Sequence, residues 1–264
     1  MRTATITWIS YNNYGTLLQA YALQKKVEQL GHENLIISDR EILNEWKKKT
    51  VKTQSEYSDA GDRKDGIFER LKRLFLNPSR LSRMILMRVN YEKYEFPYVS
   101  SQMACEKFRR NELNILYNKT LDILPALNNE FDLFIAGSDQ VWSVFESIFN
   151  SYYFLDFVTK KKVSYAPSLG TNTLSQKNCK QLKELLSDYI NISVREKTSA
   201  DQLSKLLHRK VEWVADPSFL HDRMFWERFI KEIAQREKKY LLCYFLENKK
   251  WYFSYAKQIA KKLH

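Results

Sequence analysis

Small polar residues follow a short apolar run in the middle of the chain. Residues 131–136 (FDLFIA) have the length and composition of a buried parallel strand, and Gly137, Ser138, Asp139 and Gln140 come directly after it. In open α/β sheets, the loops at the carboxyl ends of the strands carry the ligand-binding groups. The glycine permits close approach of a ligand, and the next three side chains offer hydrogen-bond donors and acceptors. The alternative is a tight turn in which Asp139 only caps the following helix.

A second polar loop precedes the first helical pattern. Residues 12–15 (NNYG) lie between an N-terminal apolar run and the periodic residues 16–30. Backbone amides of this loop and the helix dipole could hold a carboxylate or a phosphate there. The spacing matches neither a Walker loop nor a GxGxxG fingerprint, so the sequence does not support nucleotide binding through those motifs.

Arg195 comes at the end of another apolar run, with Glu196 beside it. An arginine at the carboxyl edge of a sheet is suited to bidentate recognition of an anion. The alternative is an ion pair with a neighbouring acid.

The histidines give no metal-binding pattern. His32, His208, His221 and His264 are far apart and show neither HxH nor HExxH spacing, so we expect no metal site. His221 follows a strand and a proline turn, which makes it the best of the four for proton transfer. A surface position at the start of a helix is the simpler interpretation of this residue. Neither a GxSxG elbow nor a pair of carboxylates stands out.

Alternating strand and helix patterns position these residues. Strand patterns cover residues 3–9, 35–37, 131–136, 162–166, 191–196, 211–215 and 240–246. Helical patterns cover residues 16–30, 174–189, 198–207, 222–235 and 251–263. This alternation predicts an α/β fold with a doubly wound, Rossmann-like parallel sheet. Gly15, Gly137 and Gly170 each fall just beyond a strand, and right-handed crossovers would bring their loops to one edge of the sheet, where we expect the site.

A long segment interrupts this alternation. Residues 41–64 are polar without periodicity, and a helical pattern rich in basic residues runs from residue 67 to about residue 116. We interpret residues 41–125 as a basic helical insert whose helices cover the sheet; the alternative is a helix pair that binds a membrane surface or a partner. We therefore predict a first Rossmann-like domain over residues 1–237, and the start of a second over residues 238–264.

The composition is that of a globular protein with an excess of positive charge. Hydrophobic residues make up 44% of the 264 residues, and the formal net charge is +12. A solvated, lysine-rich surface is the simpler explanation of this charge, and no nucleic-acid-binding signature accompanies it, so we expect no nucleic-acid partner. The sequence shows no signal peptide, no membrane-spanning run and no pairing pattern among its three cysteines. These features predict a cytoplasmic protein, and the basic surface would allow peripheral contact with the inner face of the membrane.

Five ordered blocks resemble the polysaccharide pyruvyl transferase family. They are residues 12–23 (NNYGTLLQAYAL), 137–142 (GSDQVW), 153–157 (YFLDF) with 164–170 (SYAPSLG), 192–196 (ISVRE) and 215–217 (ADP). Pro167 and Leu169 depart mildly from the pattern, because alanine and phenylalanine are commoner there. Ordered blocks spanning residues 12–217 are far more specific than any one motif.

The resemblance implies two Rossmann-like domains facing a cleft, as in GT-B glycosyltransferases. It also implies transfer of an enolpyruvyl group from phosphoenolpyruvate, the donor substrate, to sugar hydroxyls of a cell-surface polysaccharide or its lipid-linked precursor, which yields a pyruvate ketal. No cofactor and no metal are implied. Carried over to this chain, Arg195 would bind the donor anion and Asp139 would bind or deprotonate an acceptor hydroxyl, so these two are the predicted catalytic residues. The predicted substrate-binding residues are Asn13, Gly15, Gln19, Gly137, Ser138, Gln140, Ser168, Gly170 and Arg195.

The resemblance also predicts that this chain carries only the beginning of the second domain. Family members normally continue through a complete second domain that holds a histidine acting on the donor, and we do not assign that role to His264. An unpaired apolar strand edge favours association, for example as a homo-oligomer. Two alternatives to the enzyme remain at this point: a non-catalytic binding module that acts through a partner, and a GT-B-type glycosyltransferase that uses a nucleotide sugar.

Overall fold

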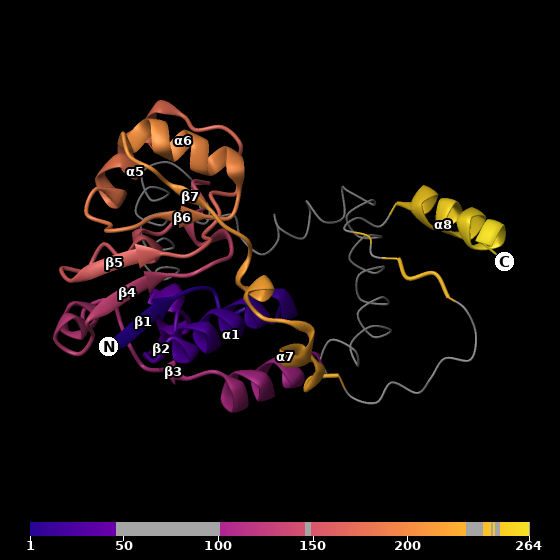
Figure 1. The fold of residues 1–264 in the computed structure, drawn as a ribbon, viewed down its shortest axis with the longest axis horizontal. Helices are drawn as coiled ribbons and strands as arrows, with labels where there is room; N and C mark the ends of the chain where they lie inside the picture. Colours follow the sequence, from indigo (N-terminus) through magenta and orange to yellow (C-terminus); the bar gives the residue numbers. More distant parts are fainter. Residues whose placement is uncertain (46–100, 146–148, 231–239, 244, 246–248, 264) are drawn as a thin grey trace, which may run out of the picture. The chain divides into compact units, whose positions relative to one another are not determined.

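The computed structural model describes residues 1–45, 101–145, 149–230, 240–243, 245 and 249–263. The chain divides into two compact units, Met1–His221 and Asp222–His264 (Figure 1). The predicted domain boundary after residue 237 and most of the predicted insert, residues 46–100, lie outside the described residues.

The first unit is built on a parallel sheet of five strands in the order β3-β2-β1-β4-β5 (Figure 1). These are β1 (Arg2–Ile6), β2 (Glu33–Ile37), β3 (Ile115–Leu116), β4 (Leu133–Ala136) and β5 (Lys161–Ser164). A short parallel pair consists of β6 (Ser193–Val194) and β7 (Glu212–Trp213). A single parallel β-bridge between Val163 of β5 and Asn191, just before β6, connects this pair to the sheet. This strand order is that of a Rossmann-like fold, so the α/β fold class is confirmed for the first unit.

Strands β1, β4 and β5 are shorter than the apolar runs that predicted them. Strand β1 ends at Ile6, which pairs with Ala136 at the end of β4, and no described strand pairs with the residues beyond. The helical pattern was wrong at residues 115–116, because the helix ends at residue 112 and these two residues pair with Ile36 and Ile37 of β2. A strand of two residues is too short to show a periodicity of its own.

Helix α1 (Tyr14–Gln29) begins directly after the loop that follows β1. Asn13 is its N-cap, and the side-chain oxygen of Asn13 accepts a hydrogen bond of 3.3 Å from the Thr16 backbone amide. Residues 101–112 are helical, as predicted, and pack against α1 through the rings of Tyr21 and Phe108, whose centroids are 5.6 Å apart. The described helix of the predicted insert therefore packs on α1, and its covering of the sheet stays a prediction.

Two further helices follow: α6 (Lys197–Leu207) packs beside β6 and β7, and α5 (Gln176–Leu186) packs beside α6 (Figure 1). Helix α5 lies within the pattern predicted at residues 174–189, and α6 begins one residue before the pattern predicted at residues 198–207. Short 3₁₀ turns complete the unit: η1 (Leu124–Asn129), η2 (Gln140–Trp142), η3 (Ser151–Phe154) and η4 (Pro217–Leu220).

The loop after β4 is anchored in the core by Trp142. This side chain is fully buried and stacks on Phe154, with ring centroids 5.4 Å apart and planes inclined by 7°. Its indole Nε1 donates a hydrogen bond of 3.1 Å to the Tyr153 carbonyl oxygen. Because a buried tryptophan holds one end and strand β4 holds the other, the polar residues between them have a fixed position.

Replacing Gly137 with alanine is expected to destabilise the fold by about 1–3 kcal/mol, because a methyl group there overpacks the junction of β1 and β4. An added Cβ would lie 3.0 Å from Thr7 Cβ and 3.2 Å from the Ile6 carbonyl oxygen. Urea unfolding of the variant and the parent protein measures this change. Gly15→Ala is the matched control, because its Cβ would meet only the Asn13 side-chain oxygen at 3.3 Å. Equal stability of Gly137→Ala and the parent would contradict the packing described here.

The second unit contains α7 (Arg223–Glu227) and α8 (Lys250–Leu263). The helix predicted at residues 251–263 is confirmed, and the one predicted at 222–235 ends at residue 227 among the described residues. The strand predicted at 240–246 is wrong for residues 240–243 and 245, which are not in a strand. A strand exists by pairing with a neighbour, and no described residue pairs with this segment.

Candidate functional site

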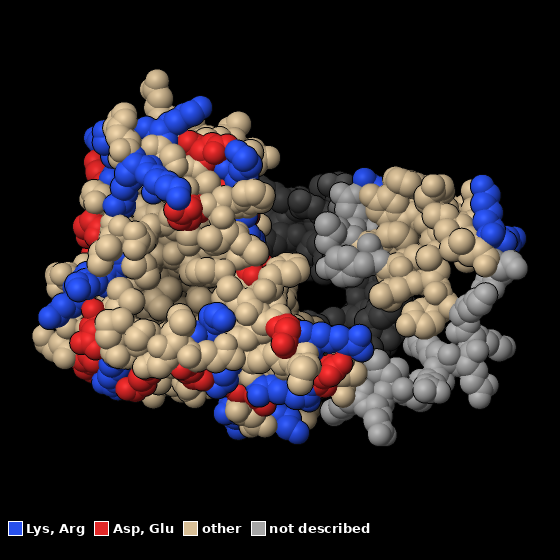
Figure 2. Space-filling view, viewed as in Figure 1, with Lys and Arg blue, Asp and Glu red and all other residues tan. Residues whose placement is uncertain are grey.

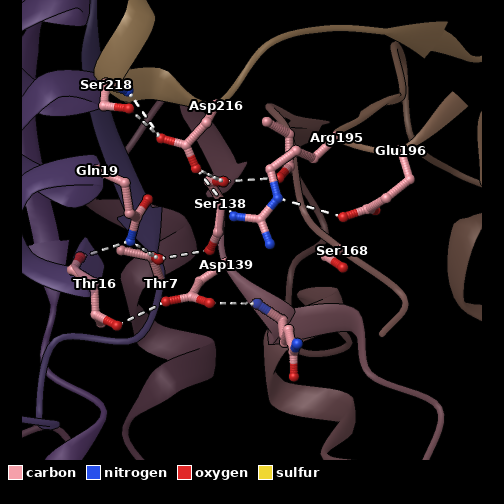
Figure 3. Close-up of polar contacts among 12 residues, drawn as sticks. Thr7, Thr16, Gln19, Ser138, Asp139, Ser168, Arg195, Glu196, Asp216 and Ser218 are labelled. Carbon is pink, nitrogen blue, oxygen red and sulfur yellow. Dashed lines mark hydrogen bonds and ion pairs between the residues drawn. The ribbon is translucent and has the colours of Figure 1, made fainter. Parts of the chain in front are cut away.

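The site lies where the strand order of the sheet reverses. Strand β1 pairs with β2 on one side and with β4 on the other, so the chain leaves β1 and β4 in opposite directions. In open α/β sheets, the carboxyl ends of two such strands leave a crevice between their loops. Here the loop after β1, the N-terminus of α1 and the loop after β4 meet in this crevice (Figure 3).

Two neighbouring cavities occupy this edge of the sheet. The arginine cavity, of about 420 Å³, is lined by Asn13, Gly15, Thr16, Leu18, Gln19, Asp139, Arg195, Asp216 and Ser218. The aromatic cavity, of about 620 Å³, is lined by Trp8, Ser10, Tyr11, Asn12, Asn13, Thr16, Asp139 and Gln140. Asn13, Thr16 and Asp139 line both, so these three residues form the wall between them.

Asp139 has a backbone conformation that glycine usually occupies. Its φ of 75° and ψ of −175° fall in a region that costs other residues of the order of 1–3 kcal/mol. Its carboxylate accepts hydrogen bonds from the Gln140 backbone amide (2.9 Å) and from the Thr16 hydroxyl (2.8 Å). The capping role considered from the sequence is therefore present, and the same carboxylate also faces both cavities.

The orientation of the Gln19 side chain is fixed by two contacts (Figure 3). Its Nε2 donates hydrogen bonds of 2.9 Å to the Thr16 carbonyl oxygen and of 2.9 Å to the Thr7 hydroxyl, which itself donates to the Ser138 carbonyl oxygen. Only the NH₂ group can point at a carbonyl oxygen, so the amide cannot be flipped. The buried Oε1 atom accepts no hydrogen bond from the described residues, although Gln19 lines the arginine cavity.

Arg195 lies between two carboxylates at the end of β6. Its Nη1 donates to Asp216 (3.0 Å) and its Nε to Glu196 (3.3 Å), while Nη2 donates to none of the described residues. Burial alone would lower the pKa of Arg195, but the hydrogen bond to Asp216 and the charges of Glu196 and Asp216 outweigh it and raise the pKa above its usual value. The ion pair considered from the sequence is thus present, and it aims the guanidinium group into the cavity (Figure 3).

Asp216 is held from two sides. Its Oδ1 accepts hydrogen bonds from the backbone amide and the hydroxyl of Ser218 (3.0 and 2.8 Å), and its Oδ2 accepts the bond from Arg195. The Ser138 hydroxyl lies 3.4 Å from the same Oδ2 and donates to the Ala166 carbonyl oxygen at 2.8 Å. Sequence reasoning assigned no role to Asp216, Ser218 or Thr16. The strand-end aspartate and proline at residues 216–217 were the available signal.

Four of the predicted substrate-binding residues lie near the cavities but do not line them: Gly137, Ser138, Ser168 and Gly170. Gly137 and Ser138 lie beneath the site, where Ser138 is fully buried. Ser168 and Gly170 belong to the loop after β5 and line neither cavity. The Ser168 backbone amide donates a hydrogen bond of 2.8 Å to the Asp139 carbonyl oxygen, so the loop after β5 stabilises the backbone conformation of Asp139.

His221 lies at the end of the first unit, away from both cavity walls. Its Nε2 is 2.8 Å from the Ala22 carbonyl oxygen on α1, which requires the proton to be on Nε2. That contact gives it a structural role. The described residues contain no cluster of three or more histidine, cysteine, aspartate or glutamate side chains that could hold a metal ion.

The visible face of the first unit carries charges of both signs. Figure 2 shows lysine and arginine side chains interspersed with aspartate and glutamate, without one continuous basic area on that face. None of the described helices has the length and apolar character that crossing a bilayer requires.

Comparison with known proteins identifies a family for this chain. No curated protein and no solved structure matches it. The family model for polysaccharide pyruvyl transferase matches residues 13–263, from the N-cap of α1 to the end of α8, and so includes every residue that both cavities share. The chain therefore belongs to the polysaccharide pyruvyl transferase family.

Proposed function

We propose that the protein transfers the pyruvyl group of phosphoenolpyruvate to two hydroxyls of a sugar in a cell-surface polysaccharide or its lipid-linked precursor. The family supports pyruvyl transfer in general. In the proposed reaction, two sugar oxygens form bonds to C2 of the donor and the C–O bond to the phosphate breaks. One hydroxyl proton goes to C3, which becomes a methyl group, and the other leaves with inorganic phosphate. The product is a cyclic ketal.

The observation that carries this proposal is the position of Arg195. Its guanidinium group reaches the arginine cavity with Nη2 still available, while Asp216 and Glu196 hold its other nitrogens. Phosphoenolpyruvate carries a phosphate and a carboxylate, and a charge-assisted hydrogen bond from arginine suits either group. The nearby N-terminus of α1 adds a favourable dipole for an anion.

The charges of the arginine cavity suggest that its described lining residues form only part of the proposed donor site. Its walls carry Arg195 but also Asp139 and Asp216, so carboxylates outnumber cations. A donor with several negative charges would be repelled unless further cationic groups approach it. We expect those groups to come from residues other than the described ones that line this cavity.

Asp139 is suited to the acceptor. Each of its carboxylate oxygens accepts one hydrogen bond, and lone pairs remain for a sugar hydroxyl. In the proposed reaction Asp139 orients that hydroxyl and takes up its proton as the oxygen bonds to C2. Because Asp139 lies in the wall between the two cavities, an acceptor on one side could reach a donor on the other.

Product analysis tests the proposal. The purified full chain is incubated with phosphoenolpyruvate and a panel of methyl hexopyranosides that offer hydroxyl pairs, and the products are analysed by mass spectrometry together with a phosphate assay. We expect one pyruvate ketal for each inorganic phosphate released. Formation of a glycoside from a nucleotide sugar, with no phosphate released from phosphoenolpyruvate, would contradict it. Ketal formation without the protein would also contradict it.

A further inference from the structure

The aromatic cavity has the side chains of a binding site for a neutral, hydroxyl-rich ligand. Trp8 and Tyr11 form one side of it, with ring centroids 5.2 Å apart and planes inclined by 57°. The Tyr11 side chain is exposed, with 46% of its surface accessible. None of the residues that line the cavity is basic, so the walls are not suited to an anion.

The loop that carries the two rings is held rigidly from below. Arg109, only 3% exposed, donates hydrogen bonds to the Ile9 carbonyl oxygen (2.6 Å), the Tyr11 carbonyl oxygen (2.7 Å) and the Asn12 side-chain oxygen (2.9 Å). The Trp8 ring also meets the buried Tyr153 ring edge-on, with centroids 6.4 Å apart. A ligand on this surface therefore binds without first having to order the loop.

The fixed position of this loop also depends on Asp39, which follows β2. The Ser10 hydroxyl donates to Asp39 Oδ1, and the Tyr153 hydroxyl donates to Asp39 Oδ2 at 3.0 Å. Burial, followed by the negative charges of Asp39 and Asp139, raises the pKa of the Tyr11 phenol. The Tyr11 hydroxyl is a hydrogen-bond donor on the wall of the aromatic cavity.

The polar walls complement the rings. The amides of Asn12, Asn13 and Gln140 provide both donors and acceptors, which is what a ring with several hydroxyl groups requires. A pyranose has an apolar face of C–H groups that packs on an aromatic ring and an edge of hydroxyls that binds amides. The cavity therefore fits a sugar ring better than an anion or a purely apolar molecule.

We propose that the aromatic cavity binds a neutral pyranose ring of the acceptor, packed on Tyr11 and Trp8, with one hydroxyl directed to Asp139. This inference rests on the proposed function, in which the arginine cavity binds the donor. The wall of Asn13, Thr16 and Asp139 separates the two cavities. A sugar hydroxyl bound at Asp139 then faces the donor side, and the rings determine which sugars are accepted.

Ligand-observed NMR with methyl hexopyranosides tests this proposal on the full-length chain. The parent protein is expected to bind at least one glycoside, with saturation transfer to the C–H face of the ring. Tyr11→Ala is expected to weaken that binding about tenfold, as the loss of one aromatic contact predicts. Tyr11→Phe keeps the ring and is expected to retain most of the affinity. In both variants the Tyr11 carbonyl oxygen still accepts the bond from Arg109.

Phosphoenolpyruvate binding, measured on the same variants, separates the possible outcomes. The proposal predicts unchanged donor affinity in Tyr11→Ala, because Tyr11 does not line the arginine cavity. Glycoside affinity that is equal in the parent and Tyr11→Ala would overturn it, and so would failure of the parent to bind any glycoside of the panel. If glycosides respond to Tyr11→Ala but phosphoenolpyruvate does not bind the parent, the sugar site stands and the proposed donor is wrong.

Discussion

Arg195→Ala is expected to reduce phosphoenolpyruvate-dependent phosphate release by about a hundredfold or more, the usual effect of removing one preorganised donor from an active site. The variant loses the guanidinium group that Asp216 and Glu196 hold at the arginine cavity. Initial rates at saturating acceptor measure this change. Circular dichroism confirms that the fold is retained, since the three side chains are only partly buried.

Two further variants isolate the role of Arg195. Arg110→Ala removes an arginine whose side chain is 74% exposed and lies away from both cavities, and it is expected to leave the rate unchanged. Arg195→Lys keeps the positive charge but loses the planar fork, so an intermediate rate is expected. If Arg195→Ala and Arg110→Ala have equal rates, Arg195 does not bind the donor.

Asp139 gives the second large effect, and two substitutions separate the role of its carboxylate from the strain of its backbone. Asp139→Ala and Asp139→Gly both lose the carboxylate, and both are expected to lower the rate by about 10²–10⁴-fold if it acts as a general base. Only glycine relieves the backbone at φ 75° and ψ −175°, so Asp139→Gly is expected to be about 1–3 kcal/mol more stable than Asp139→Ala. Urea unfolding and initial rates of the same preparations test both statements.

Asp139→Asn serves as the near-isosteric control for this pair. Its side-chain oxygen can still accept the hydrogen bond from the Gln140 amide, so the turn is retained, but the base is absent. A rate close to that of the parent in Asp139→Asn would show that Asp139 positions the loop without accepting a proton. Equal stability of the glycine and alanine variants would show that the backbone of residue 139 is unstrained.

The sequence was sufficient to predict the polar loop at the end of β4, because that loop depends on local patterns. The apolar run at 131–136 and the glycine after it are local signals, and they correctly predicted a polar loop at the end of β4. For Asp139 and Arg195, the sequence left structural and functional interpretations open. The structure shows the cap of η2 and the ion pairs directly, and it also places both residues in one cavity. Their part in substrate binding stays a prediction.

Long-range contacts could not be predicted from the sequence. Asp216 and Arg195 form an ion pair although they are 21 residues apart in the sequence. Arg109 is hydrogen-bonded to the loop after β1, which is about a hundred residues earlier in the sequence. Neither contact leaves a periodic or composition-based signal. The same limit explains the wrong strand prediction at residues 240–243 and 245, because apolar residues form a strand only when a neighbour pairs with them, and none of the described residues does so here.

Calorimetric titration of the chain with phosphoenolpyruvate tests directly whether the donor binds at Arg195 in the arginine cavity. We expect phosphoenolpyruvate binding that is lost in Arg195→Ala, retained in Arg110→Ala and unaffected by a nucleoside diphosphate. Binding of the nucleoside diphosphate in place of phosphoenolpyruvate, or equal phosphoenolpyruvate affinity in the parent and Arg195→Ala, would contradict it.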